Sequence, residues 1–332
     1  MHDSYFLLLC VIILAIIFDF INGFHDTANA IATSVSTRVL SPKVAVSMAA
    51  ILNMVGALSG TAVAKTVGAG IVEPFCITQV TVISALVAAI LWDIITWYLG
   101  LPTSSSHAIL SGVVGAAIAT AGTGVIIHKG VYKVLTGLIL APLIGFILSF
   151  FLMVLLLWLF GRSTPTLVTN LFGRLQILSA AYMAFSHGSN DAQKTMGIIT
   201  MALVSYYKLP EFHVPLWVIF VCAMAMALGT AVGGWRIIKT LGMRLFNLRP
   251  IHGFAAQTTA ATVIEIASRI GIPLSTTHVV SSTIMGVGAS KRLSAVKWGI
   301  GGNIVLAWLL TLPVCALLAW VICKGIHLWI TG

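Results

Sequence analysis

The chain has 332 residues, of which 59% are hydrophobic and only 8% are charged, and its mean hydropathy is +1.07. Because soluble globular proteins carry about 25% charged residues, this composition excludes a soluble globular protein and predicts an all-α integral membrane protein. The formal net charge of +10 does not indicate a nucleic-acid partner, since the basic residues lie at the ends of apolar segments and set orientation instead.

Ten segments of the chain are apolar enough to be membrane-spanning helices, which need about 20 residues each. They fill the chain and leave no soluble domain between them. If the two shortest segments, 103–121 and 274–289, are re-entrant hairpins, the number of crossings changes. In chain order the ten segments are 5–32, 44–64, 78–99, 103–121, 134–160, 175–203, 216–232, 252–270, 274–289 and 298–323.

The basic residues predict how these helices are oriented. With an outer N-terminus, eleven Lys and Arg residues fall in inner loops and six at outer ends, as the positive-inside rule requires. We therefore expect a multi-pass protein of the cell membrane with both termini outside. Five crossings in each half is an odd number, so the halves must be inverted repeats. The predicted division is a first repeat at 1–160, a short cytoplasmic linker at 161–174, and a second repeat at 175–332.

Each half carries a polar sequence inside one of its apolar segments. It reads N-G-F-H-D-T-A-N-A-I-A-T at 22–33 and H-G-S-N-D-A-Q-K-T-M-G-I at 187–198, which places Asp26 and Asp191 165 positions apart. An intramembrane carboxylate costs about 2.5–3.5 kcal/mol on insertion scales, so each aspartate needs a cation, a proton or a lysine as partner.

Three other acids, Asp19, Asp93 and Glu265, also fall inside apolar segments. A structural hydrogen bond between helices explains Asp19 and Asp93 as well as a functional role does. For Glu265, an ion pair with Arg269 four residues later would be sufficient. We therefore assign a role only to the repeated aspartates.

Gly23 and Gly188 lie three residues before the two aspartates. Since glycine tolerates an unwound backbone, we expect each helix to break here and to offer free carbonyl groups to a coupling cation, as half-helix ends do in transporters. Amide side chains would add neutral oxygen ligands of the kind that hard cations prefer. The candidate cation-coupling residues are Asn22, Asp26, Asn29, Asn190, Asp191, Gln193 and Lys194.

The two copies differ at one informative position, because Asn29 corresponds to Lys194 when residues are counted from the aspartates. A lysine three residues after Asp191 lies on the same helical face and can neutralise it. We hypothesise that the Lys194 ammonium stands where a cation would otherwise bind, which favours coupling to protons over sodium in this half. The alternative is that Lys194 only forms a structural pair with Asp191.

A second pair of sequences combines proline, hydroxyl groups and histidine: P-T-S-S-S-H at 102–107 and P-L-S-T-T-H at 273–278. Proline and serine favour a helix start, and free amide groups there bind anions. Two such starts from inverted halves would hold one tetrahedral oxyanion between them. Simple N-capping explains only one hydroxyl in each copy, so we assign all of them to substrate binding, together with Asp26 and Asp191. These hydroxyl residues are Ser104, Ser105, Ser106, Ser275, Thr276 and Thr277.

Four histidines, His25, His107, His187 and His278, lie within or beside these sequences. A buried histidine is more often a core residue than a functional one, although four together also suggest a proton relay. No H-x-x-x-H spacing predicts a zinc site, and the five scattered cysteines show no paired motif. We expect no resident cofactor.

The stretches 23–30, 185–194, 102–107 and 273–278 closely resemble the inorganic phosphate transporter (PiT) family, and most of all its bacterial low-affinity Pit carriers. The resemblance extends from about residue 21 to residue 313. It implies symport of inorganic phosphate with protons or sodium by alternating access in the lipid bilayer. In some bacterial members the substrate is a neutral metal–phosphate complex, and a homodimer would be ordinary for such carriers.

The chain departs from the family pattern at two places. His25 stands where asparagine is common, and Gln193-Lys194 replaces the A-N pair of many sodium-coupled members. Both departures favour proton over sodium coupling and leave phosphate recognition intact. The main alternative is a permease for sulfate or another oxyanion on the same scaffold. A receptor and an enzyme are disfavoured, since there are two inverted sites and no nucleophile–base motif.

Overall fold

The computed structural model describes residues 5–331. Within this range the chain forms twelve α-helices and no strand, with one isolated bridge between Val72 and Ile126. Short 3-10 turns lie at Pro74–Cys76, Thr123–Val125 and Leu293–Ala295, and a π-helical turn at Thr240–Arg244 continues α9. The helices are α1 (Tyr5–Ser36), α2 (Pro42–Ala57), α3 (Ala62–Ala69), α4 (Gln79–Leu99), α5 (Ser105–Ala121), α6 (His128–Phe160), α7 (Pro165–Tyr207), α8 (Leu216–Val232), α9 (Trp235–Lys239), α10 (Pro250–Arg269), α11 (Thr276–Lys291) and α12 (Trp298–Thr331).

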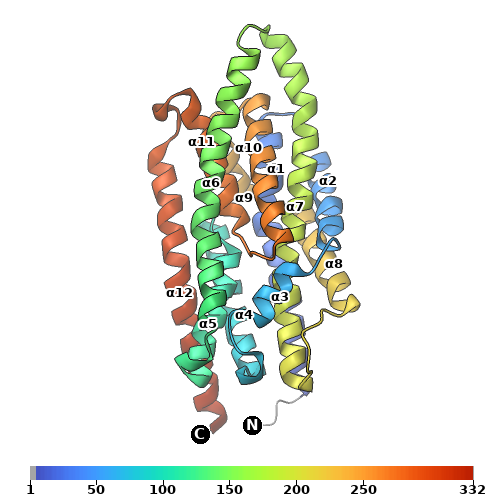
Figure 1. Cartoon of the computed structure of the whole chain (residues 1–332), viewed down its shortest axis with the longest axis vertical. Coiled ribbons are helices and arrows are strands. Elements are labelled where there is room, and N and C mark those ends of the chain that lie inside the picture. Colours follow the sequence, from blue (N-terminus) through green and yellow to red (C-terminus); the bar gives the residue numbers. More distant parts are fainter. Residues whose placement is uncertain (1–4, 332) are drawn as a thin grey trace.

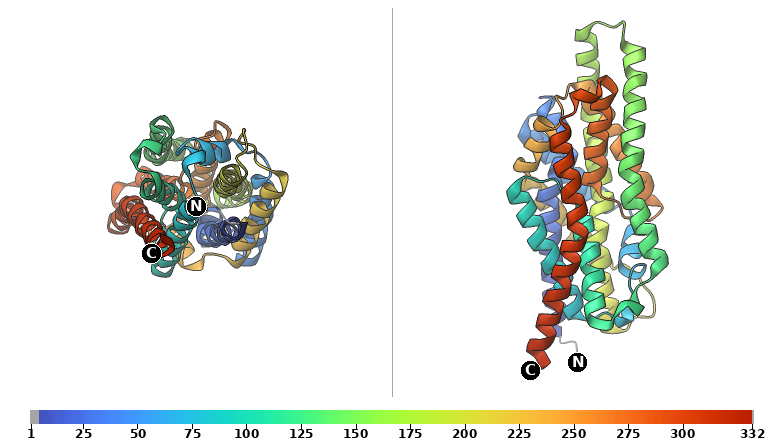
Figure 2. Two further views of the ribbon diagram at one scale, coloured as in Figure 1. Left: turned by 90° about the horizontal axis from the view of Figure 1, so that it is seen from below. Right: turned by 90° about the vertical axis from the view of Figure 1, so that its left-hand side faces the viewer.

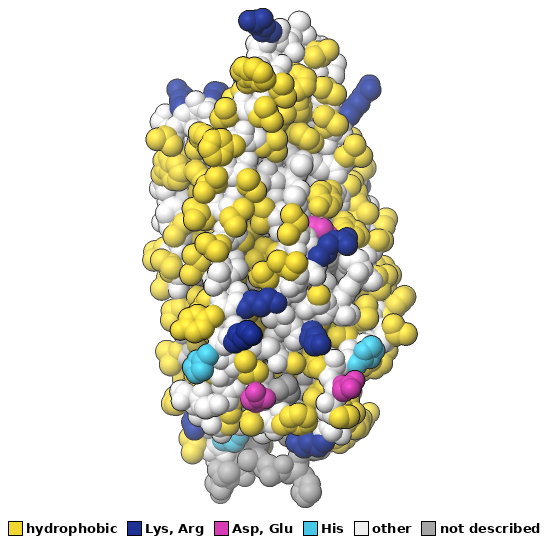
Figure 3. Space-filling view, viewed as in Figure 1, with side chains coloured by type: hydrophobic (Ala, Val, Ile, Leu, Met, Phe, Trp, Pro, Cys, Tyr) yellow, Lys and Arg dark blue, Asp and Glu magenta, His cyan; other side chains and the backbone are white. Residues whose placement is uncertain are grey.

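The helices form an elongated bundle whose long axis follows most of them (Figures 1 and 2). The start of α1 and the end of α12 lie at one end, and the turn between α6 and α7 lies at the other (Figure 1). Hydrophobic side chains cover most of the face shown in Figure 3. An apolar exterior with polar residues inside is the arrangement that a lipid bilayer requires.

Four helices of the described range, α1, α4, α6 and α12, are long and apolar enough to cross a membrane. Two more crossings result if the bent pairs α2–α3 and α8–α9 each count as one span, with bends of 70° and 59°. The ten expected crossings are therefore not established by helix length and apolarity. One reason is that α5 and α11, with 17 and 16 residues, are shorter than the roughly 20 residues of a full span.

Helices α1 and α7 carry the two aspartate sequences, and both run through them without a break. The expected unwinding at Gly23 and Gly188 is therefore wrong. The glycines serve close packing instead, because a Cβ at Gly23 would lie 3.1 Å from the Cα of Gly229 on α8, and one at Gly188 only 2.7 Å from the Cα of Asn53 on α2. Backbone unwinding and close helix contact have the same glycine signature in a sequence.

The two predicted repeats interlock. Helix α12 packs along α5, and α6 packs along α11. The last long helix of each half therefore packs against the other half. The turn between α6, which ends at Phe160, and α7, which begins at Pro165, lies within the predicted linker at 161–174. The interlocked packing brings the helix starts of α5 and α11 together beside α1 and α7.

Candidate functional site

Helices α5 and α11 begin alike at the centre of the bundle. The hydroxyl of Ser104 accepts a hydrogen bond from the backbone N–H of His107 at 3.1 Å, and Ser275 accepts one from His278 at 3.2 Å. Each is therefore an ordinary N-cap. Capping accounts for the first hydroxyl of each sequence and leaves the other two free for different partners.

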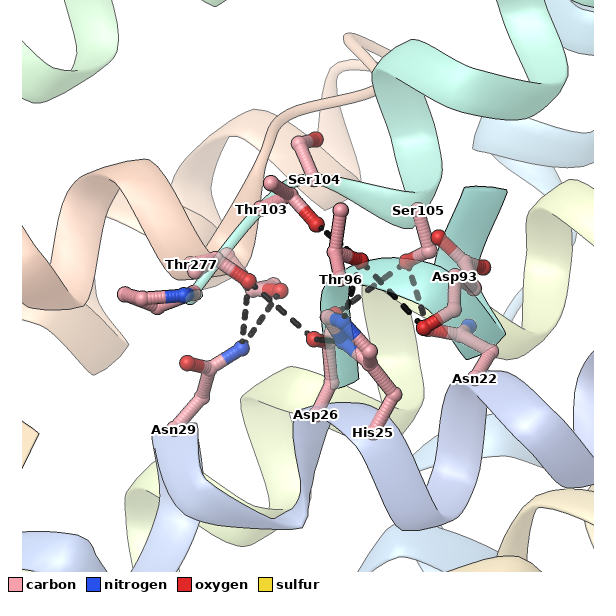
Figure 4. A network of polar contacts seen from close by, with 12 residues as sticks. Asn22, His25, Asp26, Asn29, Asp93, Thr96, Thr103, Ser104, Ser105 and Thr277 are labelled. Carbon is pink, nitrogen blue, oxygen red and sulfur yellow. Dashed lines mark hydrogen bonds and ion pairs between the residues drawn. The ribbon is translucent and has the colours of Figure 1, made fainter. Parts of the chain in front are cut away.

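The second hydroxyl of each sequence donates to the aspartate of its own half, and Figure 4 shows this contact for Ser105 and Asp26. The distance from Ser105 Oγ to Asp26 Oδ2 is 3.1 Å, and that from Thr276 Oγ1 to Asp191 Oδ2 is 2.8 Å. Ser105 Oγ also lies 2.6 Å from Asn22 Oδ1. Hydrogen bonds to a carboxylate are among the stronger ones in proteins, so both aspartates are anchored to a helix start.

The third hydroxyl of each sequence reaches across to the other half. Thr277 of α11 donates to Asp26 Oδ1 at 3.2 Å and accepts a bond from Asn29 Nδ2 at 2.9 Å. Ser106 of α5 donates to the Leu274 carbonyl at 3.0 Å and accepts a bond from the Lys194 ammonium. The contacts thus come in reciprocal pairs that join α1 to α11 and α7 to α5.

Histidines pair with both aspartates. His25 Nδ1 lies 2.7 Å from Asp26 Oδ1, and His187 Nε2 lies 3.1 Å from Asp191 Oδ2. The other ring nitrogens lie 3.3 Å from Thr96 Oγ1 and 3.0 Å from Asn53 Oδ1, respectively. The sequence left these two histidines as core residues, and the structure places them in direct contact with the carboxylates.

The aspartates of the two halves meet although 165 positions separate them. Single ligand atoms from Asp26, His187 and Asp191 all lie within 4.8 Å of one another, and all three side chains are buried. Lys194, only 1% exposed, forms an ion pair with Asp191 and donates to the Leu274 carbonyl at 2.8 Å. The arrangement is a compact buried site made of carboxylates, hydroxyls and basic groups.

The family model for "Phosphate transporter family" matches residues 22–319 of the chain. This range contains every residue of the site described so far. The chain belongs to the phosphate transporter family. It is a membrane transporter and not an enzyme.

Two bacterial relatives are each named "Probable low-affinity inorganic phosphate transporter". That of Bacillus subtilis (strain 168) is 49% identical over 315 residues, covering 94% of this chain and 95% of the relative. That of Rhizobium meliloti (strain 1021) is 48% identical over 315 residues, covering 94% of each chain. Among solved structures, "The sodium-dependent phosphate transporter" matches with a TM-score of 0.89 and 26% identity, covering 97% of this chain and 99% of that chain.

Two of the residues predicted to couple the cation take no part in the hydrogen bonds around the carboxylates. Gln193 lies on another face of α7, where its Oε1 accepts a bond from Val63 N at 2.8 Å and its Nε2 donates to the Ser189 carbonyl at 2.5 Å. Asn190 is fully buried, and neither of its amide atoms has a hydrogen-bond partner within the described residues. Neighbouring positions on a helix point in different directions, so not every polar residue of the sequence can face one site.

The structure places Asp93, an acid to which sequence reasoning assigned no role, beside the site. Asp93 of α4 is completely buried, and neither carboxylate oxygen has a hydrogen-bond partner among the described residues. It interacts electrostatically with His25 and Asp26, and Figure 4 shows all three near the start of α5. Its signal in the sequence was an acid in an apolar segment, which does not separate a site residue from a structural one.

The histidines of the two hydroxyl sequences also meet. His107 and His278 lie with ring centroids 4.3 Å apart in an edge-to-face arrangement, and His278 stacks on Trp308 at 3.9 Å. Both are buried. Nothing in the sequence indicated that these two rings, from opposite halves, would touch.

Proposed function

We propose that the protein imports inorganic phosphate by cation symport with alternating access, and that protons are favoured over sodium as the coupling ion. One observation supports this most directly: the hydroxyls of Ser105, Thr276 and Thr277 donate to the carboxylates of Asp26 and Asp191 where the two halves meet. The same hydroxyls are the donors that a bound phosphate needs.

Competition for these hydroxyls explains why a cation must accompany the anion. A phosphate next to two carboxylates is repelled, and the donors it needs are already taken. A proton or cation on Asp26 or Asp191 neutralises the carboxylate and weakens its hold on the hydroxyls. The hydroxyls then become free to bind phosphate, so substrate and coupling ion bind together.

The surroundings of the hydroxyls suit an anion. The first turns of α5 and α11 present backbone N–H groups, and the positive end of a helix dipole favours negative charge. The Lys194 ammonium contacts Ser106 and adds a full positive charge. Phosphate would then be held between the two helix starts.

The hydrogen bonds and ion pairs that the carboxylate oxygens already form favour proton coupling. A hard metal cation such as sodium requires several oxygen ligands at once. The Oδ1 atom of Asp26 already pairs with His25 and Thr277, and that of Asp191 pairs with Lys194. A proton requires only one lone pair, so it binds with less rearrangement. The sodium dependence named for the solved relative supports cation symport in general.

A divalent cation is a further part of the proposal, as cargo that arrives with phosphate. Asp26, His187 and Asp191 together offer two carboxylate oxygens and one imidazole nitrogen within 4.8 Å, which suits a metal that also holds phosphate oxygens. Such a complex would bring the anion in with reduced charge. Uptake that rises with added magnesium would support this route.

Phosphate is preferred over sulfate because it carries a proton at neutral pH. A protonated phosphate oxygen can donate a hydrogen bond to Asp26 or Asp191, whereas sulfate cannot. Unpaired acceptors make such discrimination strong. The relatives named as inorganic phosphate transporters support the same substrate.

The membrane placement is also proposed. The start of α1 and the end of α12 lie at one end of the bundle and the α6–α7 turn at the other (Figure 1). The distribution of basic residues places the end with the start of α1 outside the cell membrane. A homodimer is the expected assembly, and cross-linking in membranes would test it.

The test is uptake of radiolabelled phosphate by the purified protein in proteoliposomes, with pH, sodium and magnesium gradients imposed separately. We expect an inward proton gradient to drive accumulation, a sodium gradient to have little effect, and excess sulfate not to compete. Accumulation that needs sodium and ignores the pH gradient would contradict proton coupling. Competition by sulfate at equal concentration would contradict the substrate assignment.

A further inference from the structure

The ammonium of Lys194 occupies a place that is built like a cation site. It contacts a carboxylate of Asp191, the hydroxyl of Ser106 and the carbonyl of Leu274. Carboxylate, hydroxyl and carbonyl oxygens are the ligands that hard monovalent and divalent cations take from proteins. The side chain is fully enclosed, with 1% of its surface exposed.

Position 29 is the matching place in the first half, and it holds no charge. Counted from the aspartates, Asn29 corresponds to Lys194. Asn29 Nδ2 donates to Thr277, the third hydroxyl of the opposite half, just as Lys194 donates to Ser106. The two side chains therefore lie at equivalent points of the structure, and only one of them is a permanent cation.

We propose that Lys194 is a tethered cation that permanently fills the cation site of the second half, so that only the first half binds a transported cation. This inference rests on the proposed phosphate symport and specifies its stoichiometry. If both halves bound a transported cation, each phosphate would be accompanied by one more cation than we propose here. The transported cation binds at Asp26, beside the unpaired carboxylate of Asp93.

Charge balance supports this division. A buried charge must be compensated in the low-dielectric interior. Asp191 forms an ion pair with the ammonium of Lys194, whereas the direct partners of Asp26 among the described residues are two hydroxyls and the imidazole of His25. Asp19 also interacts electrostatically with Asp191 and Lys194, but its Oδ1 is held by Thr195 at 3.0 Å. The first half is thus the one that lacks a built-in permanent cation.

A tethered charge has a simple energetic consequence for the transport cycle. The Lys194 ammonium stays on the protein when the loaded carrier changes conformation and when the empty carrier changes back. It therefore carries no net charge across the membrane in a full cycle. A free cation in the same place would be released and would transfer one elementary charge per cycle. Replacing Lys194 by the residue of the other half therefore adds a transported cation.

The test compares the wild type, Lys194→Asn, Asn29→Lys and the double swap in proteoliposomes. The steady-state accumulation of labelled phosphate is measured with and without a membrane potential. In Lys194→Asn we expect the Hill coefficient for the coupling cation to rise from about 1 to about 2. An inside-negative potential of about 100 mV acting on one further charge should raise accumulation about 50-fold over the wild type.

The reverse substitution tests the same inference and leaves the Lys194–Asp191 ion pair intact. With Asn29→Lys both halves hold a tethered cation, so we expect cation-driven accumulation of phosphate to be lost. The double swap should restore accumulation to that of the wild type. If Lys194→Asn is too unstable to purify, the inference is tested with Asn29→Lys alone.

Equal accumulation by the wild type and either single variant would overturn the tethered-cation inference while leaving phosphate symport in place. Failure of the wild type itself to take up phosphate would instead overturn the proposed function. Phosphate exchange by the wild type without cation-driven accumulation would overturn symport, and the tethered cation with it.

Discussion

The two halves of the molecule have similar contacts at the aspartates. They differ in what surrounds the residue two positions before each aspartate, which lies on another face of the helix. Counted from the aspartates, Phe24 of α1 corresponds to Ser189 of α7. Phe24 packs edge-to-face on Trp97 with ring centroids 5.3 Å apart, and Arg236 lies over the same tryptophan. Aromatic rings and a guanidinium therefore fill this place in the first half.

The same place in the second half is a polar recess of about 250 Å³, lined by hydroxyl, amide and charged side chains. Its wall includes the serines at 59, 189 and 268, together with Gln193. Glu265 and Arg269 form an ion pair at its edge, with the arginine 73% exposed. The repeated hydroxyl–carboxylate contacts are thus embedded in unequal surroundings.

The largest expected effect is on the aspartates themselves, and it tests whether both halves are needed. Asp26→Asn and Asp191→Asn should each abolish phosphate uptake, because the first change removes the carboxylate proposed to bind the transported cation and the second removes the carboxylate that contacts Lys194 and Thr276. Uptake in proteoliposomes measures this, with insertion checked by detergent-solubilised yield. Near-normal uptake by either variant would remove that carboxylate from the mechanism.

The same two variants should differ in stability. Asp191→Asn leaves Lys194 as a buried ammonium without its counter-charge, which costs about 3–5 kcal/mol. Asp26→Asn leaves only hydrogen bonds unsatisfied, at about 1–3 kcal/mol. Thermal unfolding in detergent should show the lower midpoint for Asp191→Asn. Equal midpoints would mean that Lys194 is not held mainly by Asp191.

Glycine substitutions test the close helix contacts that replaced the expected unwinding. A Cβ at Gly188 meets the backbone of Asn53, so Gly188→Ala should cost about 1–3 kcal/mol from overpacking. Gly173→Ala on the same helix is the matched control, because a Cβ added at this position has no neighbouring atom within 4 Å among the described residues. It should stabilise the helix by about 0.5–1 kcal/mol. A destabilised control or a neutral Gly188→Ala would contradict the packing role.

The recess and the aromatic cluster can be compared by cysteine labelling. In a background where the exposed Cys76 is serine, Ser189→Cys should react with a small water-soluble thiol reagent, since the polar recess admits water. Phe24→Cys should react more slowly, because the ring of Trp97 packs against this position and no polar recess lies beside it among the pockets of the described residues. Equal labelling of the two positions would show that both halves are open to water at this depth.

The smallest expected effect is at the exposed ion pair. Arg269 Nε lies 2.8 Å from Glu265 Oε1, but the arginine side chain is largely exposed on the protein surface. Exposed pairs contribute about 0–1 kcal/mol, so Arg269→Gln should change the unfolding midpoint very little. A large loss of stability would show that the pair is buried by a partner chain or by lipid.

Much of the site was predictable from the sequence because the chemistry is repeated. The aspartates and the hydroxyl residues stand out as polar groups in apolar segments, and the structure joins Asp26, Asp191, Ser105, Thr276 and Thr277 in one network. Ser104 and Ser275 cap their helices, so the alternative of simple N-capping accounts for one hydroxyl of each sequence. Their assignment to substrate binding stays a prediction.

The failures have identifiable causes. Gly23 and Gly188 suggested broken helices, yet α1 and α7 are continuous, since glycine also permits close packing. Gln193 lies one residue before Lys194 and still points away from the carboxylates. Asp93 could not be distinguished from a structural acid, because its environment depends on helices distant in sequence.

The sequence by itself determined the membrane environment, the two pairs of polar motifs and the one mismatch between Asn29 and Lys194. These follow from composition and local pattern, since a polar group in an apolar segment is costly wherever it folds. Only the tertiary structure decided that the third hydroxyl of each motif crosses to the opposite half, and that His25 and His187 hold the aspartates. Hydrogen-bond partners are chosen by sub-ångström geometry between helices that the chain brings together from 165 positions apart.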